Sequence, residues 1–197
     1  MQIENNKEQV PFEHYEGLFR EADAKEMAAR TGAKYENGKF YVNLLGTEYQ
    51  ISHPEYTIAP GCVLPMQTFL LRYLLEGKQV AWGGGWKTFR EMPWGELYIK
   101  PYTGRVLTRA AFTFGTRVEA FANACEKMGA TKLSHGDAGF EFDFLGGYKM
   151  RIMVWAGDEE FPPNAQILYS DNFEQGFQPE DRVVAGDILI SVIKSYM

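Results

Sequence analysis

The sequence of 197 residues has few cysteines, few histidines and no long apolar run. The two cysteines, Cys62 and Cys125, lack the number and spacing of a disulfide framework or a zinc site, so we expect each to be a small buried apolar residue. The three histidines are scattered, and no serine or cysteine stands in a recognisable nucleophile pattern. We therefore predict no metal site and no cofactor from these residues.

Membrane and nucleic-acid binding are also not expected. No apolar run approaches the ~20 residues of a membrane-spanning helix, and the first residues are polar where a signal peptide is apolar. The net charge is -6, and no run of Lys and Arg offers the basic face that phosphates need. We expect a cytoplasmic, soluble protein whose partner is a small molecule or another protein.

What the sequence has is enough apolar residues, 45%, for one sizeable core. A chain of this length hides roughly 70% of its unfolded surface when it folds. We therefore predict a single domain over residues 1–197.

A helix followed by a three-stranded meander is predicted near the N-terminus. Pro11 suits the first position of a helix, and Gly32 is placed to end it. Apolar side chains then alternate over residues 40–44, after the strong hairpin signal Asn37-Gly38. Gly46-Thr47 turns the chain into the next strand. A second helix with one apolar stripe completes the unit, and this stripe consists of Met66, Phe69, Leu70, Tyr73 and Leu74.

The same order of elements is predicted near the C-terminus. Thr116 and Glu119 have the spacing of a capping box at the start of a helix. The signals that follow are a helix stop at Gly129, alternation over residues 140–144, a turn at Gly146-Gly147, a strand over 150–155 and a helix from about Pro179.

The two passages also match in sequence. The stretch "GKFYVNLLGTEY" from Gly38 aligns with "AGFEFDFLGGYK" from Ala138, with Leu45-Gly46 opposite Leu145-Gly146. We predict an α+β fold of two helix-plus-meander units related by an internal pseudo-repeat. Their structural halves are residues 11–77 and 116–197, joined by a Trp-rich connection, residues 78–115.

This connection contains the most unusual stretch, "AWGGGWKTFREMPWGE", which holds three of the four tryptophans. It is not a phosphate loop, because Ala81 and Trp86 occupy the positions where that loop requires glycine. The tryptophans fit two interpretations, a stacking platform for a ligand or a plug in the core, and the second is favoured. Arg90 could clamp a carboxylate ligand or form a buried ion pair with a distant acid.

A second polar cluster, Asp158-Glu159-Glu160, precedes Phe161-Pro162-Pro163 at the end of a predicted strand. Consecutive acids could bind a hard cation, although they lack the alternating spacing of a calcium loop. A solvated turn or an ion-pair partner for Arg90 is the better interpretation.

Three stretches resemble a family of unknown function. They are "FLLRYLLEG", "GWKTFREMPWGELY" and "VWAGDEEFPPNAQIL", and together they look like the prokaryotic domain-of-unknown-function family numbered 3786. The resemblance covers most of the chain from about Gly32, but it implies no chemistry. It suggests relatives in anaerobes, some joined to a cysteine-rich iron–sulfur module. Two isolated cysteines cannot hold a four-cysteine cluster, so no redox role is predicted for this chain itself.

Function is left with three alternatives. The favoured hypothesis is non-catalytic binding of a small molecule or protein partner at a cluster between the two half-units. The second is a hydrolase or proton-transfer enzyme that uses the Asp158–Glu160 acids, with or without a divalent cation. The third is a purely structural motif. The residues predicted to line the site are Trp86, Trp94, Arg90, Glu91, Asp158 and Glu160.

Overall fold

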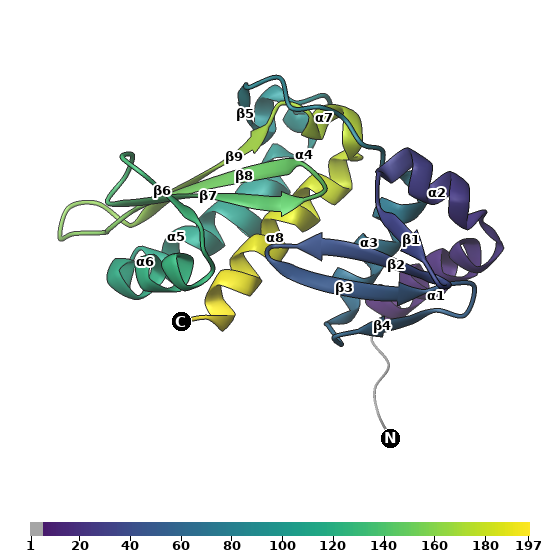
Figure 1. The fold of residues 1–197 in the computed structure, drawn as a ribbon. Coiled ribbons are helices and arrows are strands. Elements are labelled where there is room, and N and C mark those ends of the chain that lie inside the picture. The colour runs from purple at the N-terminus through teal and green to yellow at the C-terminus, as the bar shows by residue number, and fades with distance from the viewer. Residues whose placement is uncertain (1–5) are drawn as a thin grey trace. The chain divides into compact units, whose positions relative to one another are not determined.

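A computed structural model describes residues 6–197 of the chain (Figure 1). The fold class is α+β, as predicted, with antiparallel strands. The chain forms two compact units, one ending at Gln79 and the other running from Val80 to Met197. The Trp-rich connection predicted over residues 78–115 therefore belongs to the second unit from Val80 onward.

The first unit packs helices against a small sheet. Strands β4, β3 and β2 are neighbours in that order, and β1 also pairs with β2. The elements are α1 Asn6–Glu21, α2 Ala24–Thr31, β1 Lys34–Glu36, β2 Lys39–Leu44, β3 Thr47–Ser52, β4 Thr57–Ala59 and α3 Leu64–Glu76.

The single helix predicted from Pro11 to Gly32 is wrong, because the chain forms two helices there. Helix α1 already begins at Asn6, and the carboxylate of Asp23 accepts hydrogen bonds from the backbone N–H groups of Lys25 and Glu26 at 2.8 and 2.9 Å. This side chain caps a new helix, α2, and interrupts the first. The predicted stop at Gly32 is confirmed, since Gly32 caps α2 with φ +71°.

The predicted hairpins of this unit are confirmed. Asn37 and Gly38 have φ angles of +52° and +74°, the two positive values that a tight two-residue hairpin turn needs. Phe40, Val42 and Leu44 are buried while Lys39 and Asn43 are exposed, as the alternation predicted.

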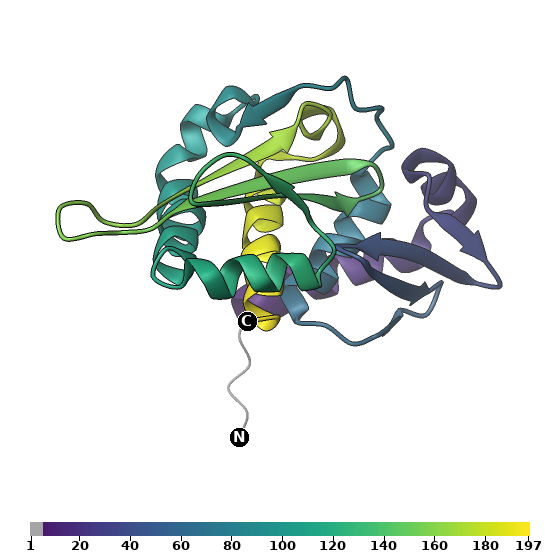
Figure 2. The ribbon, with the colours of Figure 1, turned by 60° about the vertical axis from the view of Figure 1, so that its left-hand side comes forward.

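The second unit contains a longer sheet whose strands run in the order β7-β8-β9-β5, with β6 paired to β7. Figures 1 and 2 both show helices α5 and α8 on one face of this sheet. The elements before the sheet's main strands are β5 Trp86–Thr88, a 3-10 turn Phe89–Glu91, α4 Gly95–Tyr102, a π-helical segment Thr103–Thr108, α5 Arg109–Phe114 and α6 Val118–Lys127. The remaining elements are β6 Thr131–Leu133, β7 Ala138–Leu145, β8 Tyr148–Trp155, β9 Asn164–Ser170, α7 Phe173–Gly176 and α8 Pro179–Ser195.

The capping box predicted at Thr116 is wrong. Helix α6 begins after Arg117, which makes no side-chain capping bond, and the Thr116 hydroxyl donates instead to the carbonyl of Phe112 in the preceding helix. A capping box does occur at Thr88 and Glu91, at the start of the 3-10 turn.

The core of the second unit lies between the sheet and the helices. Phe140 and Phe144 have no exposed surface, and Phe140 meets the ring of Phe121 from α6 edge-on at 5.7 Å. On β9, the Tyr169 hydroxyl donates to the carbonyl of Arg182 on α8 at 3.0 Å. Side chains that alternate with these therefore lie on the opposite face of the sheet.

Both units contain the order helix, short strand, hairpin, strand and helix, but their hairpin turns do not align as predicted. Leu44 and Thr47 flank the first turn, whereas Leu145 and Tyr148 flank the second. A register shift between Asp143 and Leu145 inserts one extra residue into β7, so Gly146-Gly147 corresponds to Leu45-Gly46. The internal repeat itself stays a prediction. Within residues 6–197, none of the helices has the length and apolar character needed to cross a membrane.

Candidate functional site

The six predicted site residues do not come together. Trp86 pairs with Ser170 at the last residue of β9, whereas the loop that holds Asp158 and Glu160 precedes Asn164 at the first residue of the same strand. Six residues of extended chain span ~20 Å. The two motifs that the sequence analysis joined into one site are therefore two regions of the second unit. We call residues 82–95 the tryptophan strap and residues 156–163 the β8–β9 loop.

Trp86 is engaged by an ion-paired arginine on the face of the sheet opposite the helices. The guanidinium carbon of Arg151 lies 3.9 Å from the centre of the Trp86 ring, and Trp82 meets that ring edge-on at 5.4 Å. Arg151 also donates two hydrogen bonds of 2.9 and 2.8 Å to one carboxylate oxygen of Glu141. The carboxylate, guanidinium and indole thus form a layered contact that needs no external ligand.

The glycines of the strap bring its backbone against Asp171. The N–H groups of Gly83 and Gly85 donate to the two carboxylate oxygens of Asp171 at 3.0 and 2.9 Å. A methyl group at either glycine would lie within 2.8 Å of the same carboxylate, so a larger residue would have to push the Asp171 side chain aside. No sequence signal identified Asp171 as the partner of these glycines.

Arg90 and Glu91 are held by neighbours in the strap. Glu91 accepts hydrogen bonds from the Thr88 backbone N–H and hydroxyl at 2.7 and 2.8 Å, and these bonds lower the pKa of Glu91. Arg90 donates to Glu96 at 2.7 Å, and both side chains are about two thirds exposed. A buried pair of Arg90 with a distant acid, or with Asp158 or Glu160, is therefore wrong.

The end of the strap is anchored by Arg182, a residue that no sequence signal marked. Its side chain is 3% exposed, and it donates to the backbone carbonyls of Pro93, Glu174 and Phe177 at 2.8 to 3.0 Å. Burial lowers the pKa of Arg182. Trp94 follows with φ +67° and is 66% exposed, so it is not a core plug.

The β8–β9 loop is a turn built on Asp158. Its carboxylate accepts the backbone N–H groups of Glu160 and Phe161 at 2.9 and 2.7 Å, and its own N–H donates to the carbonyl of Phe161. The bonds from Phe161 and Glu160 lower the pKa of Asp158. This is the solvated turn that the sequence favoured, and it fixes the position of Phe161 beside the sheet.

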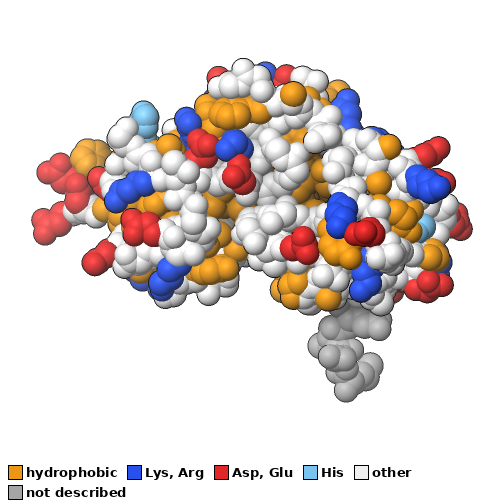
Figure 3. All heavy atoms as spheres, viewed as in Figure 1, with side chains coloured by type: hydrophobic (Ala, Val, Ile, Leu, Met, Phe, Trp, Pro, Cys, Tyr) orange, Lys and Arg blue, Asp and Glu red, His pale blue; other side chains and the backbone are white. Residues whose placement is uncertain are grey.

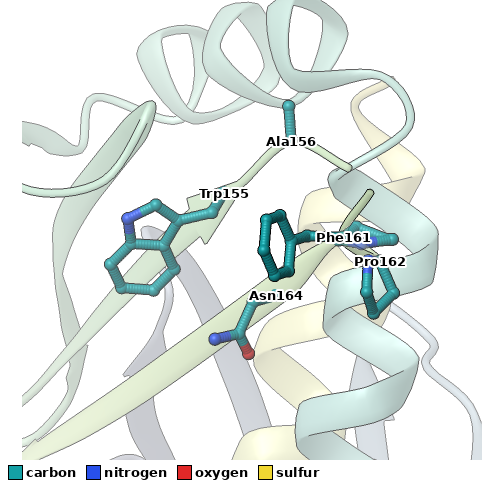
Figure 4. Close-up of a pocket in the computed structure, with 6 residues that line it drawn as sticks. Trp155, Ala156, Phe161, Pro162 and Asn164 are labelled. Carbon is teal, nitrogen blue, oxygen red and sulfur yellow. The ribbon is translucent and has the colours of Figure 1, made fainter. Parts of the chain in front are cut away.

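Beside this turn the structure has a pocket of about 470 Å³. Figure 4 shows the rings of Trp155 and Phe161 on opposite sides of Asn164, with Pro162 beyond Phe161. Phe161 is 67% exposed, and Asn164 uses its carbonyl oxygen to accept the backbone N–H of Ala165 at 2.8 Å. The full lining consists of Trp155, Ala156, Phe161, Pro162, Pro163 and Asn164.

The remaining candidates are placed as follows. Cys125 is buried, as predicted, whereas Cys62 is only partly buried, and burial raises the pKa of Cys62 to about 11. Within residues 6–197, no three His, Cys, Asp or Glu side chains form a group that could hold a metal ion. The enzyme hypothesis stays a prediction without a geometric feature to support it.

Comparison with known proteins identifies the family. The model of the family described as "Domain of unknown function (DUF3786)" matches residues 23–192, and the chain belongs to that family. No curated protein and no solved structure matches the chain. The prokaryotic origin, the occurrence in anaerobes and the iron–sulfur association stay predictions of the resemblance.

Proposed function

We propose that this member of the DUF3786 family is a non-catalytic binding protein whose ligand site is the pocket beside the β8–β9 loop. The supporting observation is the pair of aromatic walls, Trp155 and Phe161, around a hollow of about 470 Å³. Pockets of this size with aromatic and apolar walls and a few polar groups are the usual form of a ligand site.

The contrast with the tryptophan strap favours the pocket. Trp86 already contacts Arg151 and Trp82, so a ligand would have to displace contacts within the fold. Phe161 is 67% exposed while the turn of Asp158 fixes its backbone, so binding has to order only its side chain. A cytoplasmic location belongs to this proposal, and two free cysteines are consistent with a reducing compartment.

The proposal can be tested by NMR on the indole N–H signals of the four tryptophans. The probes are four fragments, namely indole, phenol, prolinamide and benzamidine, each titrated into the full chain. We expect at least one of them to shift the Trp155 signal while the Trp94 signal stays in place. The same titration of Phe161→Ala is expected to give no shift at Trp155.

The matched control is Leu97→Ala, which removes an equally exposed apolar side chain on α4 and is expected to bind as the unmodified protein does. The proposal is wrong if no fragment shifts Trp155. It is also wrong if the shift persists in Phe161→Ala, or if the fragments shift Trp82 and Trp86 instead.

A further inference from the structure

The pocket and the loop beside it have two of the three chemical groups that come together in two clusters elsewhere in the second unit. On the strands of the second unit, the guanidinium of Arg151 lies between the Trp86 ring, 3.9 Å away, and the carboxylate of Glu141. Nearby, the ammonium of Lys149 lies 5.6 Å from the Trp82 ring and 2.8 Å from a carboxylate oxygen of Asp143. Each arrangement combines an indole, a carboxylate and a cation.

Trp155, the last residue of β8, supplies an indole and the β8–β9 loop supplies carboxylates, but the loop holds no cation. Asp158, Glu159 and Glu160 are all exposed, and residues 156–163 include no Lys, Arg or His. Figure 3 shows acidic side chains gathered at the left-hand end of the view, where Figure 1 places this loop. Within residues 6–197, neither Glu159 nor Glu160 forms an ion pair.

We propose that the pocket binds a cationic side chain, the guanidinium of arginine or the ammonium of lysine, carried by an exposed segment of a partner protein. This inference rests on the proposed function of the pocket. The cation is attracted to the faces of Trp155 and Phe161, and the exposed acids that directly precede Phe161 in the chain add long-range electrostatic attraction. An anionic group would approach a loop, residues 156–163, whose only charged side chains are carboxylates.

Two features favour a cation on a polypeptide over a free small cation. The pocket volume of about 470 Å³ leaves room for an alkyl stem and flanking backbone as well as the charged group, and the rings of Pro162 and Pro163 give that stem apolar surface. Asn164 accepts a hydrogen bond from Ala165 through its amide oxygen, and the N–H groups of the same amide are donors suited to a backbone carbonyl of the partner.

The test uses the full chain and three acetylated, amidated pentapeptides of sequence Gly-Gly-X-Gly-Gly, where X is arginine, citrulline or norleucine. Citrulline keeps the shape of arginine without its charge. Binding is followed by NMR at the Trp155 indole N–H signal. We expect the arginine peptide to bind roughly tenfold more tightly than the citrulline peptide, and less tightly as salt is raised.

Variants locate the charge effect. The double variant Glu159→Gln/Glu160→Gln is expected to weaken binding of the arginine peptide several-fold, while Asp158 is left intact to keep the turn. Glu48→Gln/Glu55→Gln makes the same charge change at exposed positions in the first unit and is expected to leave binding unchanged. If the two double variants weaken binding of the arginine peptide equally, only the net charge of the protein affects binding. This result would overturn the inference.

The remaining outcomes separate this inference from the function on which it rests. If the arginine and citrulline peptides bind equally and Phe161→Ala abolishes both, the pocket is a ligand site but its cation preference is wrong. If no peptide binds while neutral fragments do, the conclusion is the same. If the arginine peptide binds Phe161→Ala unchanged, both proposals fail. If free N-acetylarginine amide binds as tightly as the arginine pentapeptide, the flanking backbone adds nothing. The claim that the cation is carried by a polypeptide would then be overturned.

Discussion

The tryptophan strap and the β8–β9 loop differ in where their polar and aromatic groups find partners. In the strap, Gly83 and Gly85 donate to Asp171, Glu91 caps its own turn, and Arg182 anchors Pro93. In the loop, Asp158 holds the turn, but Phe161 and the two glutamates contact solvent. The unusual sequence of the strap is therefore explained by contacts within the fold, whereas the loop is the region that we propose as a binding site.

The largest effect is expected at Gly95, the last residue of the strap. A methyl group there would lie 2.1 Å from the carbonyl oxygen of Phe89 and 2.8 Å from that of Arg90. Because backbone atoms cannot move aside cheaply, Gly95→Ala should lower the free energy of unfolding by about 3 kcal/mol in chemical denaturation. Gly104→Ala, where no atom lies within 4 Å, is the control and should be close to neutral. Equal stability of the two variants would contradict the tight packing of the strap.

A smaller loss is expected when the strap loses its anchor. Asp171→Ala removes the acceptor for the N–H groups of Gly83 and Gly85 and should cost about 2 kcal/mol. Asp171→Asn keeps one acceptor oxygen, so its free energy of unfolding should lie between those of Asp171→Ala and the unmodified chain. The measurement is again chemical denaturation. A midpoint unchanged in Asp171→Ala would show that the glycines have no structural role there.

In the loop, the expected effect is local and depends on pH. The pKa of Asp158 is lowered below its ordinary value of 3.8 by the N–H groups of Phe161 and Glu160. A carboxyl group with a lowered pKa stabilises the folded turn above the unfolded pKa, and this contribution is lost as the pH falls through the folded pKa. NMR should therefore give Asp158 a pKa below 3.8, with the amide signals of Glu160 and Phe161 following the same titration. A pKa at or above 3.8 would argue against the turn.

The smallest effect is expected at Arg90. Its only ion-pair partner within the described residues is Glu96, and both side chains are about two thirds exposed. Exposed pairs contribute little to stability, so the denaturation midpoint of Arg90→Ala should match that of the unmodified protein within error. A clear loss would indicate that Arg90 contacts a group not seen here.

Much of the fold could be predicted from local patterns. The hairpin at Asn37-Gly38, the helix stop at Gly32 and the last helix from Pro179 follow from residue types that few other conformations accommodate. The break at Asp23 and the extra residue in β7 were missed, because a cap or a bulge depends on contacts that the alternating pattern does not record.

The candidate site was predicted less well for a physical reason. The three acids before Phe161 were recognised as one polar cluster. Whether Trp86 lies beside them depends on which end of β9 each region adjoins, and the sequence does not show this. Trp155 lay within a stretch that resembles the family, yet its position as a pocket wall depends on the turn that positions Phe161. Asp171 and Arg182 had no signal, since both act on backbone groups of distant segments.

The central claim is that the tryptophan strap stabilises the fold, whereas the pocket beside the β8–β9 loop binds a cationic side chain of a partner protein. The most direct measurement compares Trp86→Ala with Trp155→Ala, each assayed for unfolding free energy and for binding of the arginine pentapeptide. We expect Trp86→Ala to lose about 2 kcal/mol of stability with binding retained, because it forfeits the contacts to Arg151 and Trp82. Trp155→Ala should lose binding with a smaller loss of stability. The opposite result, with binding lost in Trp86→Ala and retained in Trp155→Ala, would contradict the account.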